Sequence, residues 1–131
     1  MEFNYNDGGR SKYFKADHVG DCVCRAIAIA TNKDYKEVYD TIKKVTKENP
    51  RNGISKRGCK KICEHYGAKW VATMKIGSGC KVHLTEEEMP KKGRLVCSVS
   101  KHYTCIIDGV INDTYDPSRD GTRCVYGYWI F

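Results

Sequence analysis

Cys22 is the residue of this chain best placed for nucleophilic chemistry. It follows Asp21, and from Val23 onward apolar residues recur at helical spacing, so its thiol lies at the start of a predicted helix. The free N–H groups and the dipole of a helix N-terminus lower the pKa of a thiol, and the thiolate is the reactive form. The same N–H groups can stabilise an oxyanion when the sulfur attacks a carbonyl. Gly20, just upstream, would let a substrate backbone approach closely.

A thiol nucleophile needs a base, and the chain offers four histidines. His65 lies on a predicted helix, His83 lies in a loop among charged residues, and His18 is a chain neighbour of the Cys22 helix. Only His102 begins a predicted strand that enters a hairpin. We therefore expect His102 to be the base.

The hairpin after His102 can be indexed from its turn. Asp108-Gly109 favours a two-residue type I′ turn, so Ile107 faces Val110 and the antiparallel ladder continues outward from that pair. A loop of three residues would shift every pair by one position.

With the two-residue turn, Asp113 lies on the same face of the hairpin as His102. The two are diagonal neighbours, about 7 to 8 Å apart along the backbone, within reach of a side-chain hydrogen bond. A carboxylate there would hold the imidazole tautomer and stabilise its cation. With the shifted register, Asn112 or Asp116 would face His102 instead. The plainer interpretation is a surface histidine beside a turn aspartate.

The elements that position these residues follow from the period of the apolar residues. We expect a first helix capped by Asp21, a second that begins at Asp34 with Glu37 and ends before Asn49-Pro50, and a third from Ser55 to Gly67. After Gly67 the period changes to two, which predicts strands over 70–76, 95–99, 103–107, 110–113 and 124–130. Residues 1–20 are expected to be an extended lead-in. The sequence thus predicts an α+β fold, with N-terminal helices packed on a C-terminal antiparallel sheet.

Length and composition limit the class of protein. A chain of 131 residues with 40% hydrophobic and 30% charged residues fits one folded domain, residues 1–131, and excludes disorder for most of it. No stretch approaches the roughly 18 apolar residues of a membrane span, and the first residues lack the apolar run of a signal peptide. We expect no contact with a membrane and a cytoplasmic location.

The eight cysteines are expected to be reduced, because no export signal is seen. Their spacing lacks the paired C-x-x-C pattern of a zinc ribbon, so neither a metal nor a cofactor is expected. Most of these thiols should act as small buried hydrophobic groups.

The formal charge is 23 − 16 = +7, which favours acidic partners. One region, in which only Glu48 opposes the positive charge, holds much of the excess: Lys43, Lys44, Lys47, Arg51, Lys56, Arg57, Lys60 and Lys61. It is either a solvated face of two helices or a patch for a nucleic acid or an acidic protein.

Several segments together resemble small papain-like cysteine peptidase-type proteins encoded by bacteriophages and bacteria. They are Gly20-Asp21-Cys22-Val23, 25–30, Ser100-Lys101-His102 and 108–116, and the similarity extends roughly from residue 6 to 129. The resemblance implies a papain-like fold, with Cys22, His102 and Asp113 as catalytic residues and, for a phage protein, a location in the host bacterial cytoplasm.

Two features depart from that family. The chain has no Gln to complete an oxyanion hole, so His18, a Lys or Asn of the lead-in, or the backbone alone would take its place. The chain is also short for a peptidase, which suits a narrow substrate or a processing role.

Two functional hypotheses follow. The first is a cysteine hydrolase that acts on an amide or isopeptide bond of a protein or peptide through a thioester, with deamidation or acyl transfer as related outcomes of the same three roles. The second is a papain-like module with little or no activity that binds a host protein or nucleic acid through its basic surface.

Overall fold

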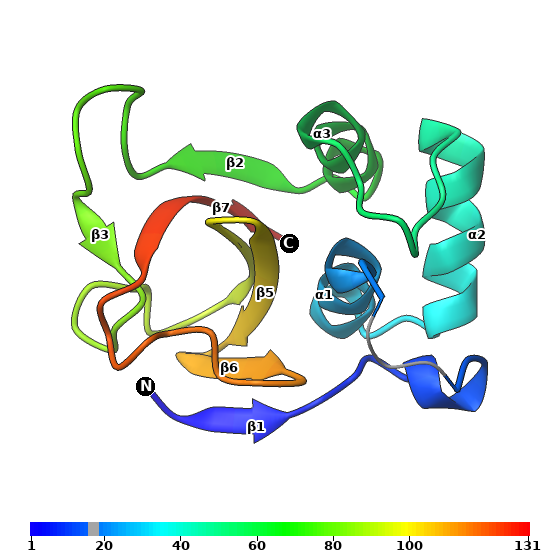
Figure 1. Cartoon of the computed structure of the whole chain (residues 1–131), viewed down its shortest axis with the longest axis horizontal. Coiled ribbons are helices and arrows are strands. Elements are labelled where there is room, and N and C mark those ends of the chain that lie inside the picture. The colour runs from blue at the N-terminus through cyan, green and yellow to red at the C-terminus, as the bar shows by residue number, and fades with distance from the viewer. Residues whose placement is uncertain (16–18) are drawn as a thin grey trace.

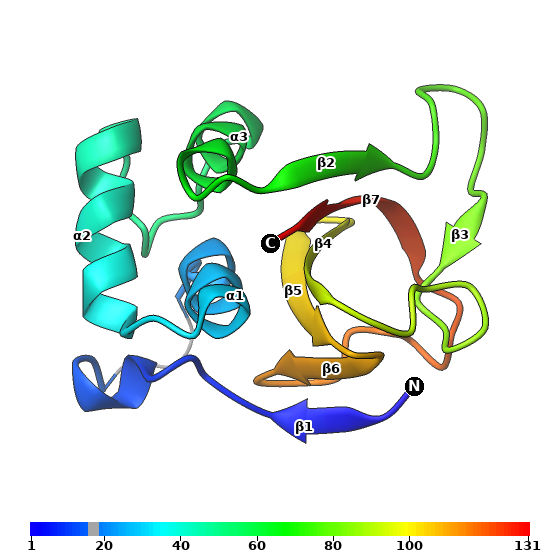
Figure 2. The same ribbon diagram turned by 180° about the vertical axis from the view of Figure 1, so that it is seen from behind.

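The computed structural model describes residues 1–15 and 19–131 and has an α+β fold, which confirms the predicted class. Three α-helices lie on one side of a strongly curved, seven-stranded sheet (Figures 1 and 2). The elements in chain order are β1 (Phe3–Tyr5), the short 3-10 helix η1 (Arg10–Lys12), α1 (Cys22–Thr31), α2 (Tyr35–Thr46), α3 (Lys56–His65), β2 (Lys69–Ala72), β3 (Val82–His83), β4 (Arg94–Val99), β5 (His102–Ile107), β6 (Val110–Asp113) and β7 (Cys124–Ile130).

The sheet is mixed rather than antiparallel, so that part of the prediction is wrong. The strand order is β1-β6-β5-β4-β7-β2, with β3 paired to β7, and all pairs are antiparallel except β1 with β6. β1 comes from the expected lead-in and pairs with β6 so that Phe3 lies opposite Ile111 and Tyr5 opposite Asp113. The chain between β1 and β6 contains the three helices and the strands β2 to β5, so it is long enough for the connection that a parallel pair requires.

The predicted helix starts agree with the structure, with one difference in detail. The Asp34 carboxylate accepts hydrogen bonds from the backbone N–H groups of Lys36 and Glu37, and the Ser55 hydroxyl accepts one from the first turn of α3. Each cap satisfies N–H groups that the helix itself leaves free. Asp21 occupies the N-cap position of α1, but its side chain makes no capping bond.

Helix α1 is the central element of the fold. It lies between α2 and β5 in both views (Figures 1 and 2), and eight of its ten residues are buried. The outer side of the sheet packs on it, in a cluster that includes Ile27, Val38, Ile62, Val96, Cys105 and Trp129. A second cluster fills the inner side of the curved sheet and includes Leu84, Leu95, Ile106, Ile111 and Val125. Burial on both sides fixes α1 against β5, and so fixes the N-terminus of α1 relative to the hairpin.

The β5–β6 hairpin has the predicted register. Ile107 lies opposite Val110, and the two turn residues Asp108 and Gly109 have φ angles of 47° and 82°, the two positive values of a type I′ turn. The two-residue turn is therefore confirmed, and the three-residue alternative is wrong.

Strand prediction is weaker at the other end of the sheet, where β2 and β3 pair with β7. The expected strand over 70–76 is too long, because β2 ends at Ala72 and the chain then leaves the sheet in an exposed loop. The two-residue strand β3, Val82–His83, was not predicted, since two residues show no periodicity.

Two of the eight cysteines form a disulfide, Cys80–Cys124, so the expectation of reduced thiols is wrong for this pair. Five of the six free cysteines are buried, as predicted: Cys24, Cys59, Cys63, Cys97 and Cys105. Cys22 is the free cysteine that remains partly exposed.

Over the residues that the structure describes, no helix has the length and apolar character needed to cross a membrane.

Candidate active site

The N-terminus of α1 and the β5–β6 hairpin meet at a pocket of about 630 Å³. Cys22 and His102 both line it, although 80 residues separate them in the sequence (102 − 22). The other lining residues are Tyr5, Arg10, Val19, Gly20, Arg25, Lys101, Thr114 and Tyr115. The pocket is thus built from the lead-in, the central helix and both ends of the hairpin.

His102 is held by Asp113 inside this site. Its Nε2 lies 2.7 Å from Oδ2 of Asp113, and the two side chains are only 8% and 4% exposed. Because Nε2 faces the carboxylate, Nδ1 is the ring nitrogen left to exchange a proton with Cys22. The predicted pairing of His102 with the same-face aspartate is therefore present in the structure.

Electrostatics favour a protonated imidazole here. Burial lowers the pKa of His102, but the hydrogen bond with Asp113 and the nearby Cys22 side chain raise it, and the result is a pKa of about 9. Burial is the largest single influence on Asp113 and raises its pKa. The hydrogen bond and charge of His102, together with the nearby Thr104 hydroxyl and a hydrogen bond from the Thr114 N–H, outweigh burial, and the net pKa is lowered. The site can therefore hold a carboxylate and an imidazolium side by side near neutral pH.

The Asp113 carboxylate is itself fixed by α1. Its Oδ1 accepts a hydrogen bond of 2.7 Å from the Thr114 N–H, and the Arg25 guanidinium lies 3.6 Å from the same oxygen. Arg25 also donates a hydrogen bond of 2.7 Å to the Thr114 hydroxyl. These contacts occupy Oδ1 and leave Oδ2 for His102.

A buried ionic cluster anchors the start of α1. Asp21 is fully buried and lies 3.2 Å from Arg10 and 3.1 Å from Arg25, and the Tyr35 hydroxyl donates a 2.9 Å hydrogen bond to its Oδ2. With its carboxylate committed to these partners, Asp21 does not cap the helix. No N-cap side chain therefore competes for the free N–H groups in the first turn of α1, and these groups can donate to an oxyanion.

Sequence reasoning assigned Asp21 only the role of a cap and did not assign Arg10 or Arg25 to the site. Arg25 carried a signal that could have been used, because it is the one charged residue in the apolar run from Val23 to Ala30. A cation in the middle of a buried helix needs a carboxylate partner.

Gly20 lines the pocket and also has a structural role that was not predicted. A Cβ on Gly20 would lie 2.9 Å from the backbone nitrogen of Gly53, whose N–H donates a 2.8 Å hydrogen bond to the Gly20 carbonyl. The Gly20 N–H in turn donates to the Arg51 carbonyl at 3.1 Å. The absence of a side chain thus lets the α2–α3 loop approach and fix the residue before the site.

Among the described residues, the others considered as a base or as its partner do not line the Cys22 pocket. His65 is exposed and stacks edge to face on Tyr66, while His83 lies beside Cys80. The Asn112 side chain accepts a hydrogen bond from Asn4, and neither it nor Asp116 lines the pocket.

The structure describes some, but not all, of the groups considered as hydrogen-bond donors to an oxyanion. His18, one of the groups considered for this role, falls in 16–18, outside the described residues. In the described part of the chain, the N–H of Cys22 itself, at the first position of α1, is a donor close to the Cys22 sulfur. The exposed rings of Tyr5 and Tyr115 form the rim, and the centroid of the Tyr115 ring lies 5.1 Å from that of His102.

No group of three or more His, Cys, Asp or Glu side chains that could hold a metal ion occurs within 1–15 and 19–131. In comparisons with known proteins, no protein-family model, curated protein or solved structure matches this chain.

Proposed function

We propose that this protein is a papain-like cysteine hydrolase that cleaves an amide or isopeptide bond through Cys22, His102 and Asp113. One observation carries the proposal: Cys22 lines the same pocket as an imidazole that a buried carboxylate holds at 2.7 Å. A nucleophile at the head of a central helix, with its base and orienting acid on later strands, also agrees with the resemblance in sequence.

Each residue has a defined step in this mechanism. The Cys22 thiol gives its proton to Nδ1 of His102, and the thiolate attacks the carbonyl carbon of the substrate. The N–H groups at the start of α1 stabilise the oxyanion, and the His102 imidazolium protonates the leaving amine. Asp113 supports the imidazolium throughout.

The thioester is then resolved with the same groups. Neutral His102 takes a proton from water, which attacks the thioester and releases the acid and the Cys22 thiol. A substrate amine in place of water gives acyl transfer, and a primary amide substrate gives deamidation with ammonia as the leaving group. A pocket of about 630 Å³ suits a short segment of a protein substrate, with Tyr5 and Tyr115 as its contacts at the rim.

The test compares wild-type protein with Cys22→Ala in a bacterial lysate. Quantitative mass spectrometry of new N-termini, freed lysine side chains and deamidated glutamines separates peptidase, isopeptidase and deamidase activity. We expect at least one class of product with the wild type and none with Cys22→Ala or His102→Gln. The proposal is wrong if stoichiometric wild-type protein gives no product beyond those of Cys22→Ala.

One observation favours the second hypothesis, a binding module. Seven of the eight basic residues singled out on α2, the following loop and α3 are exposed: Lys43, Lys44, Lys47, Lys56, Arg57, Lys60 and Lys61. If this surface binds nucleic acid, the affinity falls steeply with salt, and Lys60→Glu with Lys61→Glu reduces the slope of log K against log salt by about 2. An unchanged slope excludes this surface as the binding site.

A further inference from the structure

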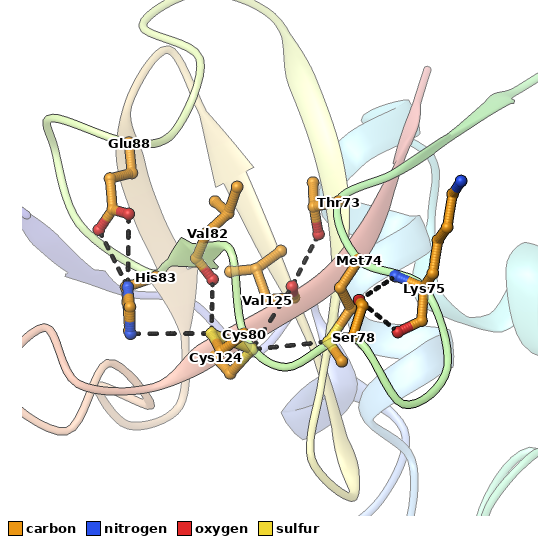
Figure 3. Close-up of a disulfide and its surroundings, with 10 residues drawn as sticks. All are labelled: Thr73, Met74, Lys75, Ser78, Cys80, Val82, His83, Glu88, Cys124 and Val125. Carbon is orange, nitrogen blue, oxygen red and sulfur yellow. Dashed lines mark hydrogen bonds and ion pairs between the residues drawn. A yellow bond between two sulfur atoms is a disulfide. The ribbon is translucent and has the colours of Figure 1, made fainter.

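The Cys80–Cys124 disulfide lies beside a histidine that is itself held by a carboxylate. Figure 3 shows His83 between Cys80 and Glu88, with its Nε2 3.7 Å from the Cys80 sulfur and its Nδ1 3.3 Å from Oε1 of Glu88. The Thr85 hydroxyl donates a 3.1 Å hydrogen bond to Oε2 of the same carboxylate. None of these residues lines the Cys22 pocket.

The two sulfurs differ in their access to solvent. Cys80 is exposed, whereas Cys124 is the half-buried first residue of β7. A small thiol arriving from solvent therefore reaches Cys80 first. An imidazole beside a cysteine sulfur stabilises the thiolate, which is both the attacking and the leaving form in thiol–disulfide exchange.

We propose that Cys80–Cys124 is a reversible disulfide that exchanges with low-molecular-weight thiols of the glutathione class through Cys80. His83 is the proton acceptor and donor for Cys80, and Glu88 is a positioning residue for His83. This inference is independent of the chemistry at Cys22.

The exchange balances in atoms and electrons. A small thiolate attacks the Cys80 sulfur, the bond to Cys124 breaks, and Cys124 leaves as a thiolate that takes a proton from solvent. A second small thiolate attacks the sulfur of the bound small thiol, and Cys80 leaves as a thiolate that His83 stabilises and protonates. Two small thiols become one small disulfide, and the protein disulfide becomes two thiols.

The disulfide also tethers a surface loop. Residues 75–79 are exposed, and within the described part of the chain no hydrogen bond joins them to another segment. Thr73 holds the start of the loop by donating a 2.7 Å hydrogen bond to the Val125 carbonyl, and Cys80 holds its end (Figure 3). Reduction removes the attachment at Cys80, and the pairing of Val82 in β3 with β7 is then the next attachment along the chain.

This loop forms one wall of a cleft of about 940 Å³ between α3 and the β2–β7 edge. Met74, Ile76 and Gly77 line the cleft from the loop, and Trp70 and Trp129 line it from the strands. Exchange at Cys80 would therefore change the freedom of this wall. In the oxidised form the cleft is held in the shape seen here.

The exchange is tested with Cys22→Ser and Cys124→Ser combined, which leaves Cys80 as the exposed thiol while the other five are buried. With oxidised glutathione, intact-mass and peptide analysis should show a mixed disulfide at Cys80. His83→Gln should slow its formation about tenfold, because the thiolate loses its partner, and the matched variant His65→Gln at another exposed histidine should not. Equal rates with and without His83 would overturn the proposed role.

A second measurement uses the full chain with both cysteines, so it does not depend on the folding of the first variant. In a glutathione redox buffer the disulfide should open and re-form while circular dichroism stays unchanged, and amide exchange of 73–81 should rise about tenfold in the reduced form while α1 is unaffected. A disulfide that resists millimolar reduced glutathione until the chain is unfolded contradicts the proposal. So does a loop whose amide exchange is the same in both forms.

Discussion

Asp113 and the Cys22 sulfur both stabilise the cationic form of His102, and the stability of the fold therefore depends on pH. The folded-state pKa of His102, about 9, lies above the ordinary value of 6.5, so protonation stabilises the folded state. The contribution is complete below pH 6.5 and is lost as the pH rises through the folded-state pKa of about 9.

We therefore predict that the free energy of unfolding falls by up to about 3 kcal/mol between pH ~6.5 and ~9 on account of this residue. Urea titrations across that range measure it. His102→Gln should lose this part of the slope, because the titrating group is gone. If the free energy of unfolding has the same slope against pH in the variant and in the wild type, the partners of His102 do not raise its pKa.

Arg25 joins two buried carboxylates, those of Asp21 and Asp113. Arg25→Met removes the cation that the two carboxylates share and leaves Asp21 with Arg10 and Asp113 with His102. A broken buried ion pair costs about 3 to 5 kcal/mol. Urea unfolding should show this loss. The matched control is Lys36→Met, which removes an exposed pair with Asp40 and should change stability by less than about 1 kcal/mol. Similar effects of the two substitutions would contradict the role given to Arg25.

At the scale of single residues, local geometry made the candidate triad predictable, whereas the ionic cluster was not. The Asp108-Gly109 turn set the register of the hairpin, and the register brought Asp113 to His102. The partners of Asp21 come from η1, α1 and α2, and no local pattern indicates that these side chains meet.

At the scale of elements, the contact between Gly20 and the loop before α3 positions the head of α1. Gly20→Ala places a Cβ against the Gly53 backbone, which cannot yield without moving the loop. We predict a loss of about 1 to 3 kcal/mol in stability and slower alkylation of Cys22, since the helix start shifts from His102.

Gly53→Ala is the control for this contact. A Cβ at residue 53 would meet open space, but the backbone there has a φ of +80°. The substitution should therefore cost about 1 to 2 kcal/mol of backbone strain, with little change in the reactivity of Cys22. If Gly53→Ala slows the alkylation of Cys22 as much as Gly20→Ala does, the close approach of Gly20 to the Gly53 backbone is not what positions the thiol.

The long periodic elements were predictable, and the short ones were not. The three helices carry apolar stripes and capping residues, and β5 and β6 share a diagnostic turn. β1 and β3 have three and two residues, and each is a strand only because a partner strand lies beside it. The pairing of Cys80 with Cys124 likewise depends on β7 lying beside β3, which the spacing of cysteines does not reveal.

At the scale of the whole molecule, the N-terminal segment returns to support the candidate site. β1 lies along β6, and the Asn6 N–H donates a 2.8 Å hydrogen bond to the Asp113 carbonyl (Figure 1). The lead-in is thus a sheet edge in contact with Asp113. Parallel pairing of distant segments has no signature in a local sequence pattern, so the mixed sheet escaped prediction.

Deletion of residues 1–5 should expose β6 as a free edge. We predict faster amide exchange in β6, by about tenfold or more, with β7 unchanged because it lies on the other side of β4. Cys22 alkylation should slow as Asp113 loses its backbone support. Unchanged protection of β6 would show that β1 adds nothing to the hairpin.

The central claim is that His102 activates Cys22, and the rate of iodoacetamide alkylation at Cys22 tests it most directly. Exposure alone makes Cys22 faster than the buried thiols, so the comparison that decides is wild type against His102→Gln, with peptide mapping at neutral pH. We predict that His102→Gln slows the alkylation of Cys22 at least about tenfold, since the imidazolium no longer stabilises the thiolate. Equal rates in the two proteins would contradict the account.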